Sequence, residues 1–116
     1  MTIMSNKEFT TATSVFGSTF TRYHGWINVG LIDCRLRPDD IIHWAETRNL
    51  VSELRMHTPD FMPLLPSADW QTKKEQYQRF LDSIADLAAA ILQKDIIDAK
   101  AKSEAMAKAW TCFSGR

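Results

Sequence analysis

Two stripes of apolar residues at helical spacing follow each other almost without a gap in the second half of the chain. The first spans residues 70–91, and its steps of three, four and seven residues keep one face of a helix toward a partner. The second spans residues 96–113, with Asp95 in the position of an N-cap and Asp98 in the first turn, where a carboxylate suits the helix dipole. The connection is too short for anything but a tight reversal, so we predict an antiparallel pair of helices.

A further helix is predicted to open at Pro38, because proline is tolerated at the first helical position and Asp39 and Asp40 follow it. Its expected core face consists of Ile41, Trp44, Leu50, Val51 and Leu54. Residues 57–69 then hold three prolines, which exclude a regular helix, together with side chains too apolar to stay in solvent. We predict that they form a crossover loop packed over one end of the core.

The first part of the chain admits two interpretations. Ser5 and Glu8 have the spacing of a capping box, and a helical stripe follows, made of Phe16, Phe20, Tyr23, Ile27 and Leu31. Residues 12–33 are also rich in β-branched residues and glycine, so a β-hairpin turning at His24 and Gly25 is the alternative. We favour the helix because an isolated two-stranded hairpin is marginally stable. The expected fold is an all-α, antiparallel four-helix bundle with a Pro-rich crossover loop.

Composition supports a single domain over residues 1–116, since 45% of the residues are hydrophobic and 24% are charged. Fourteen basic and fourteen acidic side chains give a formal net charge of zero, so no global field attracts nucleic acid or an anionic membrane. The start lacks the pattern of a secretory signal, and no stretch reaches the roughly 18 apolar residues that a membrane span needs. We expect a cytoplasmic protein that binds neither nucleic acid nor membrane.

No motif for catalysis or metal binding stands out. Cys34 and Cys112 are too few for a zinc cluster, and in a reducing compartment we expect free, half-buried thiols. His24, His43 and His57 lie on three different segments, and none has the i, i+4 spacing of paired metal ligands. We therefore expect no catalytic residue, no metal site and no cofactor, and we do not expect an enzyme.

The order of elements in the rest of the chain is similar to a known plan. A Pro-rich segment is followed by a Pro-x-x-x-Trp entry at Pro66–Trp70, the long helix YQRFLDSIADLAAAI, a short Lys-Asp turn and a last helix DIIDAKAKSEAMAKAWTCFSGR that ends in arginine. This succession resembles cytochrome c-prime and its haem-b-binding relatives. The likeness covers the last three predicted helices and implies the four-helix fold.

The resemblance does not extend to the haem. In that family the last helix carries Cys-x-x-Cys-His, and the matching window here, Ala109–Phe113, keeps only the second cysteine and has Phe113 in place of the axial histidine. The haem-b relatives use a histidine near the end of the last helix, whereas the last histidine of this chain is His57. We interpret the window as the apolar end of a core helix, in which Trp110 and Phe113 continue the stripe.

Two classes of function remain. The first is a non-catalytic binding module that acts through protein contact, as a homodimer, by binding a second protein, or both, for example as an immunity protein, an inhibitor or an assembly factor. Aromatic residues are enriched in interface cores, and the predicted interface residues are Phe16, Phe20, Tyr23, Trp26 and Trp44. The alternative is a haem-b-binding, cytochrome-like redox or ligand-binding protein that recruits His24, His43 or methionines as ligands.

The first predicted helix has apolar residues on more than one face. Tyr23 and Trp26, or Val29 and Ile32, cannot all join the stripe that faces the core. This excess predicts a two-fold dimer through the first and second predicted helices, in which the glycines of the first helix let two copies cross closely. The competing interpretation is that the Pro-rich segment covers the extra face within one chain.

Overall fold

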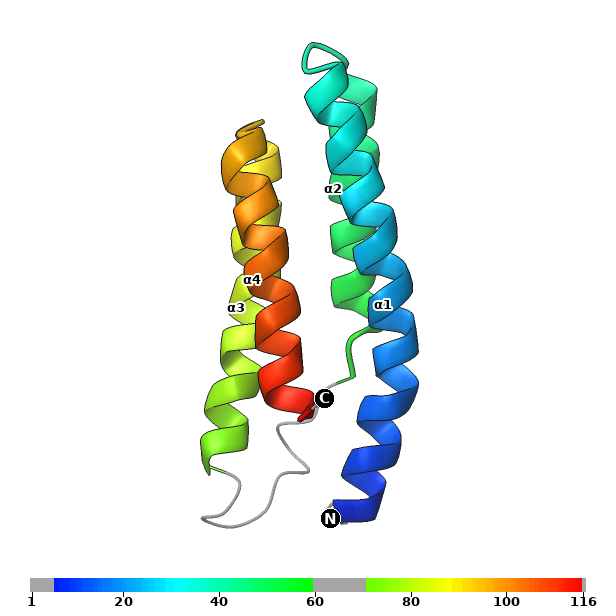
Figure 1. Cartoon of the computed structure of the whole chain (residues 1–116), viewed down its shortest axis with the longest axis vertical. Coiled ribbons are helices and arrows are strands. Elements are labelled where there is room, and N and C mark those ends of the chain that lie inside the picture. Colours follow the sequence, from blue (N-terminus) through cyan, green and yellow to red (C-terminus); the bar gives the residue numbers. More distant parts are fainter. Residues whose placement is uncertain (1–5, 60–70, 116) are drawn as a thin grey trace.

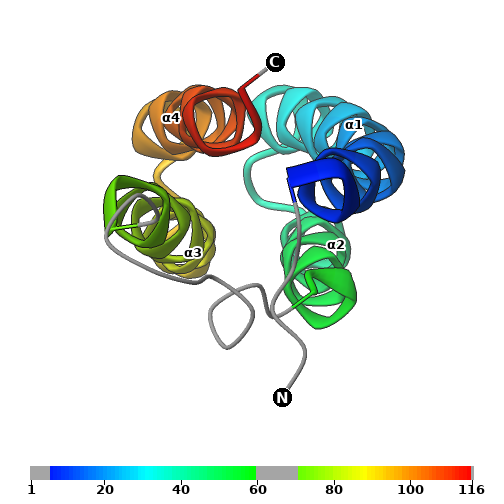
Figure 2. The ribbon, with the colours of Figure 1, turned by 90° about the horizontal axis from the view of Figure 1, so that it is seen from below.

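Four helices make up the part of the chain that the computed structural model describes, which is residues 6–59 and 71–115. They are α1 (Asn6–Leu36), α2 (Ile41–His57), α3 (Gln71–Leu92) and α4 (Ile96–Ser114), and the described residues contain no strand. The helices occupy the corners of a square, with α1 beside α2 and α4, and α3 beside α4 and α2 (Figure 2). The predicted all-α, antiparallel four-helix bundle is confirmed.

The bundle consists of two helical hairpins, α1/α2 and α3/α4. Packing is more extensive within each hairpin than across the α1/α4 and α2/α3 seams that join them. At one end, the α1/α2 hairpin reaches past the turn between α3 and α4 (Figure 1). None of the described helices is long and apolar enough to cross a membrane.

The first segment is a helix rather than a β-hairpin, because α1 is one unbroken helix of 31 residues. Its buried face consists of Phe9, Thr13, Phe16, Phe20, Ile27, Leu31 and Cys34. A Cβ added to Gly30 would lie 2.4 Å from Thr47 Oγ1, so this glycine lets α2 approach α1 closely. Burial of the apolar face outweighs the helix penalty of the glycines, which is about 1 kcal/mol each relative to alanine.

The turn between α1 and α2 differs from the prediction. The second helix begins at Ile41 rather than Pro38, which lies in the turn. Asp40 is the N-cap, and its carboxylate accepts a hydrogen bond from the Ile42 backbone N–H at 3.0 Å. Ile41, expected in the core, is 66% exposed, because Trp44 takes the inward position of the first turn. The Trp44 indole Nε1 donates to the Pro38 carbonyl at 2.9 Å and closes the turn.

The predicted reversal between α3 and α4 is confirmed. Asp95 caps α4, since its side chain accepts a hydrogen bond from the Asp98 backbone N–H at 3.0 Å. Lys94 adopts a left-handed conformation with φ 57°, and its N–H donates to the Ile91 carbonyl at 3.0 Å, which ends α3. The two helices bury matching faces, made of Tyr77, Phe80, Ile84, Leu87, Ala90 and Ile91 on α3 and of Ala99, Ser103, Met106, Trp110 and Phe113 on α4.

The core is aromatic at the end where α4 finishes. The ring centroids of Phe80 and Trp110 are 5.2 Å apart, and those of Tyr77 and Phe113 are 5.0 Å apart. Trp110 and Phe113 are therefore core residues, as the apolar stripe of the last helix predicts. Trp70 and most of the predicted crossover loop lie outside the described residues.

Candidate interaction surface

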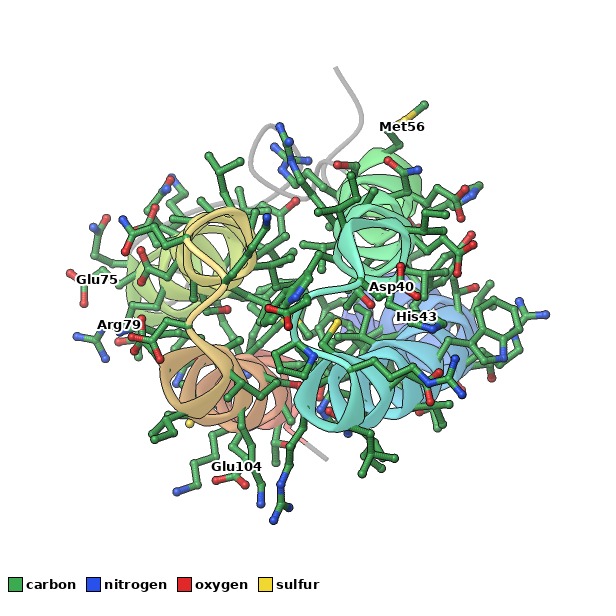
Figure 3. The ribbon with its side chains drawn as sticks, turned by 90° about the horizontal axis from the view of Figure 1, so that it is seen from above. Asp40, His43, Met56, Glu75, Arg79 and Glu104 are labelled. Carbon is green, nitrogen blue, oxygen red and sulfur yellow. The ribbon has the colours of Figure 1, made fainter. Side chains whose placement is uncertain are left out.

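Large hydrophobic side chains are exposed mainly on the α1/α2 hairpin. Among the described residues, this hairpin exposes Val15, Trp26, Val29, Ile32, Leu36, Ile41, Ile42 and Met56. The α3/α4 hairpin exposes only Leu92 and Ile97 among its described residues. Outward positions of α3 carry charged residues instead, such as Glu75 and Arg79, which project away from the bundle (Figure 3). The first hairpin thus presents an apolar surface that the second lacks.

A subset of the exposed residues of α1 follows a seven-residue repeat, and we call this subset the α1 outer stripe. The stripe consists of Val15, Ser18, Arg22, Gly25, Val29, Ile32 and Leu36, all of which are exposed. Alternating steps of three and four keep these residues on one side of the helix, and two helices that share this repeat can pack along a common seam. Core residues such as Ile27 and Leu31 belong to a different face. The prediction that Val29 and Ile32 lie off the core stripe is confirmed.

Trp26 borders the α1 outer stripe. Its ring packs edge-on against Tyr23, with centroids 5.2 Å apart, and the residue is 49% exposed. The Tyr23 ring also contacts His57 of α2, with centroids 5.7 Å apart. Burial, followed by the neighbouring Glu53 carboxylate, raises the pKa of Tyr23 above its ordinary value. Trp26 is therefore supported from one side by Tyr23 and remains open on the other, as an anchor residue of an interface would be.

Three of the predicted interface residues lie in the core of the monomer. Phe16 and Phe20 are 4% and 5% exposed because their rings pack against Trp110, at centroid distances of 5.1 and 5.6 Å. Trp44 is 3% exposed because it closes the turn between α1 and α2. These three side chains present almost no surface to a partner. Of the predicted set, Tyr23 is half-buried and Trp26 contributes the exposed ring.

The sequence interpretation missed two of the apolar residues of the α1 outer stripe. Val15 and Leu36 are 68% and 72% exposed, and they lie at opposite ends of the α1 outer stripe. Both are separated from Val29 by multiples of seven residues. Val15 and Leu36 could therefore have been predicted from their seven-residue spacing relative to Val29.

The two cysteines are free, but neither is half-buried as expected. Cys34 is fully buried, with its Sγ 3.8 Å from Thr47 Oγ1, and burial raises the pKa of its thiol. Cys112 is exposed on α4. The expectation is wrong because the close approach of α1 and α2 encloses Cys34, whereas Cys112 lies off the buried face of α4.

The histidines do not form a common site. His24 stacks on Phe20 with centroids 5.6 Å apart, and His43 lies 3.5 Å from an oxygen of Asp40 near the start of α2 (Figure 3). His57 packs against Tyr23 instead. In the described ranges, no three His, Cys, Asp or Glu side chains are grouped so that they could hold a metal ion.

The end of α4, where the resembled family attaches haem, is filled by side chains. The Trp110 ring has Phe16, Phe20 and Phe80 around it, at centroid distances of 5.1, 5.6 and 5.2 Å. The described part of α4 contains no histidine. The residues present at this end therefore do not fit a haem group.

Comparisons of the chain with models of protein families, with curated proteins and with solved structures find no match. The resemblance to cytochrome c-prime remains an expectation from the sequence.

Proposed function

We propose that this chain is a non-catalytic helical-bundle protein that acts through protein contact, first of all with a second copy of itself. The observation that carries the proposal is the α1 outer stripe, with Trp26 beside it. Large apolar side chains are exposed at Val15 and between residues 26 and 36 of α1, and such exposed apolar groups are typical of a surface that another molecule covers. Trp and Arg are enriched among the residues that dominate binding energy, and Trp26 and Arg22 supply both here.

A second copy suits this surface because the stripe is self-complementary. Its seven-residue repeat packs against a helix with the same repeat, and a Cβ added to Gly25 would have no atom within 4 Å, which leaves room for close approach. Arg22 and Asp33 flank the segment 26–29 symmetrically, so an antiparallel two-fold pair centred on this segment would bring Arg22 of one copy next to Asp33 of the other. The formal net charge of zero leaves no general repulsion between copies.

Sedimentation equilibrium at micromolar concentration tests the proposal. The wild-type chain is expected to sediment as a dimer of 13.3 kDa subunits, and Trp26→Glu is expected to sediment as a monomer. Ile97→Glu is the matched control, because Ile97 is 82% exposed on the other hairpin, and it should remain dimeric. A wild-type chain that is monomeric throughout contradicts the dimer, and a dimer that survives Trp26→Glu moves the interface away from α1.

A visible absorption spectrum of the purified protein checks the haem-b alternative. We expect a colourless, folded protein, because aromatic rings occupy the end of the bundle where α4 finishes. A Soret band at one haem per chain would overturn the proposal in favour of the cytochrome-like function.

A further inference from the structure

A groove between α1 and α4 combines apolar and cationic residues. It encloses about 390 Å³, and its apolar lining comes from Leu31, Ile32 and Ile96. Arg35 and Lys100 line the same groove. Sites for small ligands range from roughly 300 to 1,000 Å³, so the groove has room for a small ligand.

A polar contact explains why large side chains do not fill this seam. Ser103, a small buried residue of α4, donates a hydrogen bond from its hydroxyl to Asn28 Oδ1 of α1 at 2.8 Å. At this level the two helices therefore meet through short polar side chains. The apolar residues beside the contact remain uncovered, and Ile32 is 57% exposed.

Neither of the two cations of the groove forms an ion pair with a carboxylate of the described residues. The ion pairs found between described residues include His43–Asp40 and Lys102–Asp98, and neither involves Arg35 or Lys100. The aliphatic stems of arginine and lysine can lie along apolar surface while their charged heads stay accessible. An anionic group at the groove therefore meets two unpaired positive charges.

The groove has a direction. Because Asn28 pairs with Ser103 and the two helices are antiparallel, Arg35 lies toward the start of α4, and Glu104 lies toward the opposite end. The Glu104 side chain projects away from α4 (Figure 3). Arg35 thus lies at one end of the groove and Glu104 at the other, and Lys100 lies between them, one helical turn from Glu104.

Two further grooves of the described bundle lack this combination. The groove between α2 and α3 encloses about 270 Å³ and has a single cation, Arg55. The groove between the first half of α1 and the end of α4 encloses about 410 Å³ and has no charged residue in its lining. Volume alone does not distinguish the three grooves, but the cations in their linings do, since the first has two, the second one and the third none.

We propose that the groove lined by Leu31, Arg35 and Lys100 binds a free amphiphile with one carboxylate head and a short aliphatic chain. The carboxylate pairs with Arg35, whose planar guanidinium suits bidentate contact, and with Lys100. The chain lies over the apolar lining, where each buried methylene strengthens binding. The site does not depend on the proposed dimer, although Ile32 borders both surfaces.

Titration calorimetry with three eight-carbon probes, octanoate, octan-1-ol and octylammonium, tests the site. We expect octanoate to bind about five- to tenfold more tightly than octan-1-ol, since two partly exposed ion pairs give an effect of that order, and octylammonium to bind most weakly. Arg35→Gln combined with Lys100→Gln should reduce the preference for octanoate to less than about twofold. Arg55→Gln in the α2/α3 groove is the matched control and should leave the preference unchanged.

Amide chemical shifts recorded during the same titration locate the ligand. Octanoate should change the amide chemical shifts of Asn28, Leu31 and Ile96. The changes should be equal in Trp26→Glu, which would show that binding at this site does not require the dimer. Equal binding of the acid and the alcohol, absence of binding at millimolar octanoate, or shifts centred on the α2/α3 groove would overturn the proposal. The proposal would also be overturned if the protein sedimented with phosphatidylglycerol vesicles but did not respond to octanoate. The anionic group that the groove recognises would then be part of a lipid surface and not of a free acid.

Discussion

The α3/α4 hairpin buries nearly all of its large apolar residues, whereas the α1/α2 hairpin buries one set and exposes another. On α3, Ile84 and Leu87 are buried while Glu75 and Arg79 face solvent. On α1, Ile27 and Leu31 are buried while many apolar residues of the opposite side remain exposed. A helix with one apolar face finds its partners within the bundle, but a helix with two apolar faces has one face left over. The difference is why we place the interface on α1.

The largest expected effect comes from breaking the hairpin that is complete within the monomer. Ile84→Asp, at a residue 2% exposed, buries an unpaired charge and should cost about 3–5 kcal/mol of unfolding free energy. Met106→Asp on the facing helix should have a similar effect. Urea denaturation followed by circular dichroism measures both, with the exposed Ile97→Asp as control. An Ile84→Asp protein as stable as wild type would show that this face is in solvent.

An intermediate effect is expected where the two helices of the first hairpin approach most closely. Gly30→Ala places a Cβ against Thr47 and should cost about 1–3 kcal/mol, as overpacking does. Gly25→Ala in the same helix meets no neighbouring atom and should be neutral or stabilising by up to about 1 kcal/mol. Thermal unfolding of both variants at low protein concentration gives the comparison. Equal stability of the two variants would mean that α1 and α2 are not in close contact at Gly30.

The smallest expected effect separates the exposed apolar residues of the two hairpins. At low concentration, Leu36→Lys and Ile97→Lys should each change the unfolding free energy by less than about 0.5 kcal/mol, because both side chains are exposed. At high concentration, the wild type and Ile97→Lys should gain stability from dimer formation, and Leu36→Lys should not. Melting temperatures at two concentrations measure this. A concentration effect that Leu36→Lys retains would remove Leu36 from the interface.

Sequence periodicity was sufficient to predict the α3/α4 hairpin. Its apolar stripes, the Asp95 cap and the short connection are local features, and the structure has both helices, the cap and the reversal where the sequence places them within the described residues. The start of α2 was harder to place. Proline favours the first helical position, but the Asp40 side chain accepts from the Ile42 N–H, and this cap sets the helix start beyond Pro38.

The surface of α1 was only partly predictable, because burial of a ring depends on what other helices bring to it. Phe20 and Trp26 are both aromatic residues of one helix, yet Phe20 meets Trp110 from the end of the chain and Trp26 meets only its neighbour Tyr23 among the described rings. Such long-range contacts are not visible in residue spacing. Spacing does show that Val29 and Ile32 lie off the core stripe, and there the sequence was sufficient.

The most direct test of the account is isotope-filtered NMR on a mixture of labelled and unlabelled chains, which detects contacts between copies. We predict nuclear Overhauser effects between copies that involve the side chains of Val15, Trp26, Val29 and Leu36, and none that involve Leu92 or Ile97. Contacts between copies that lie on α3 and α4, or a complete absence of such contacts at millimolar concentration, would contradict the claim that the outer side of α1 meets a second copy of the chain.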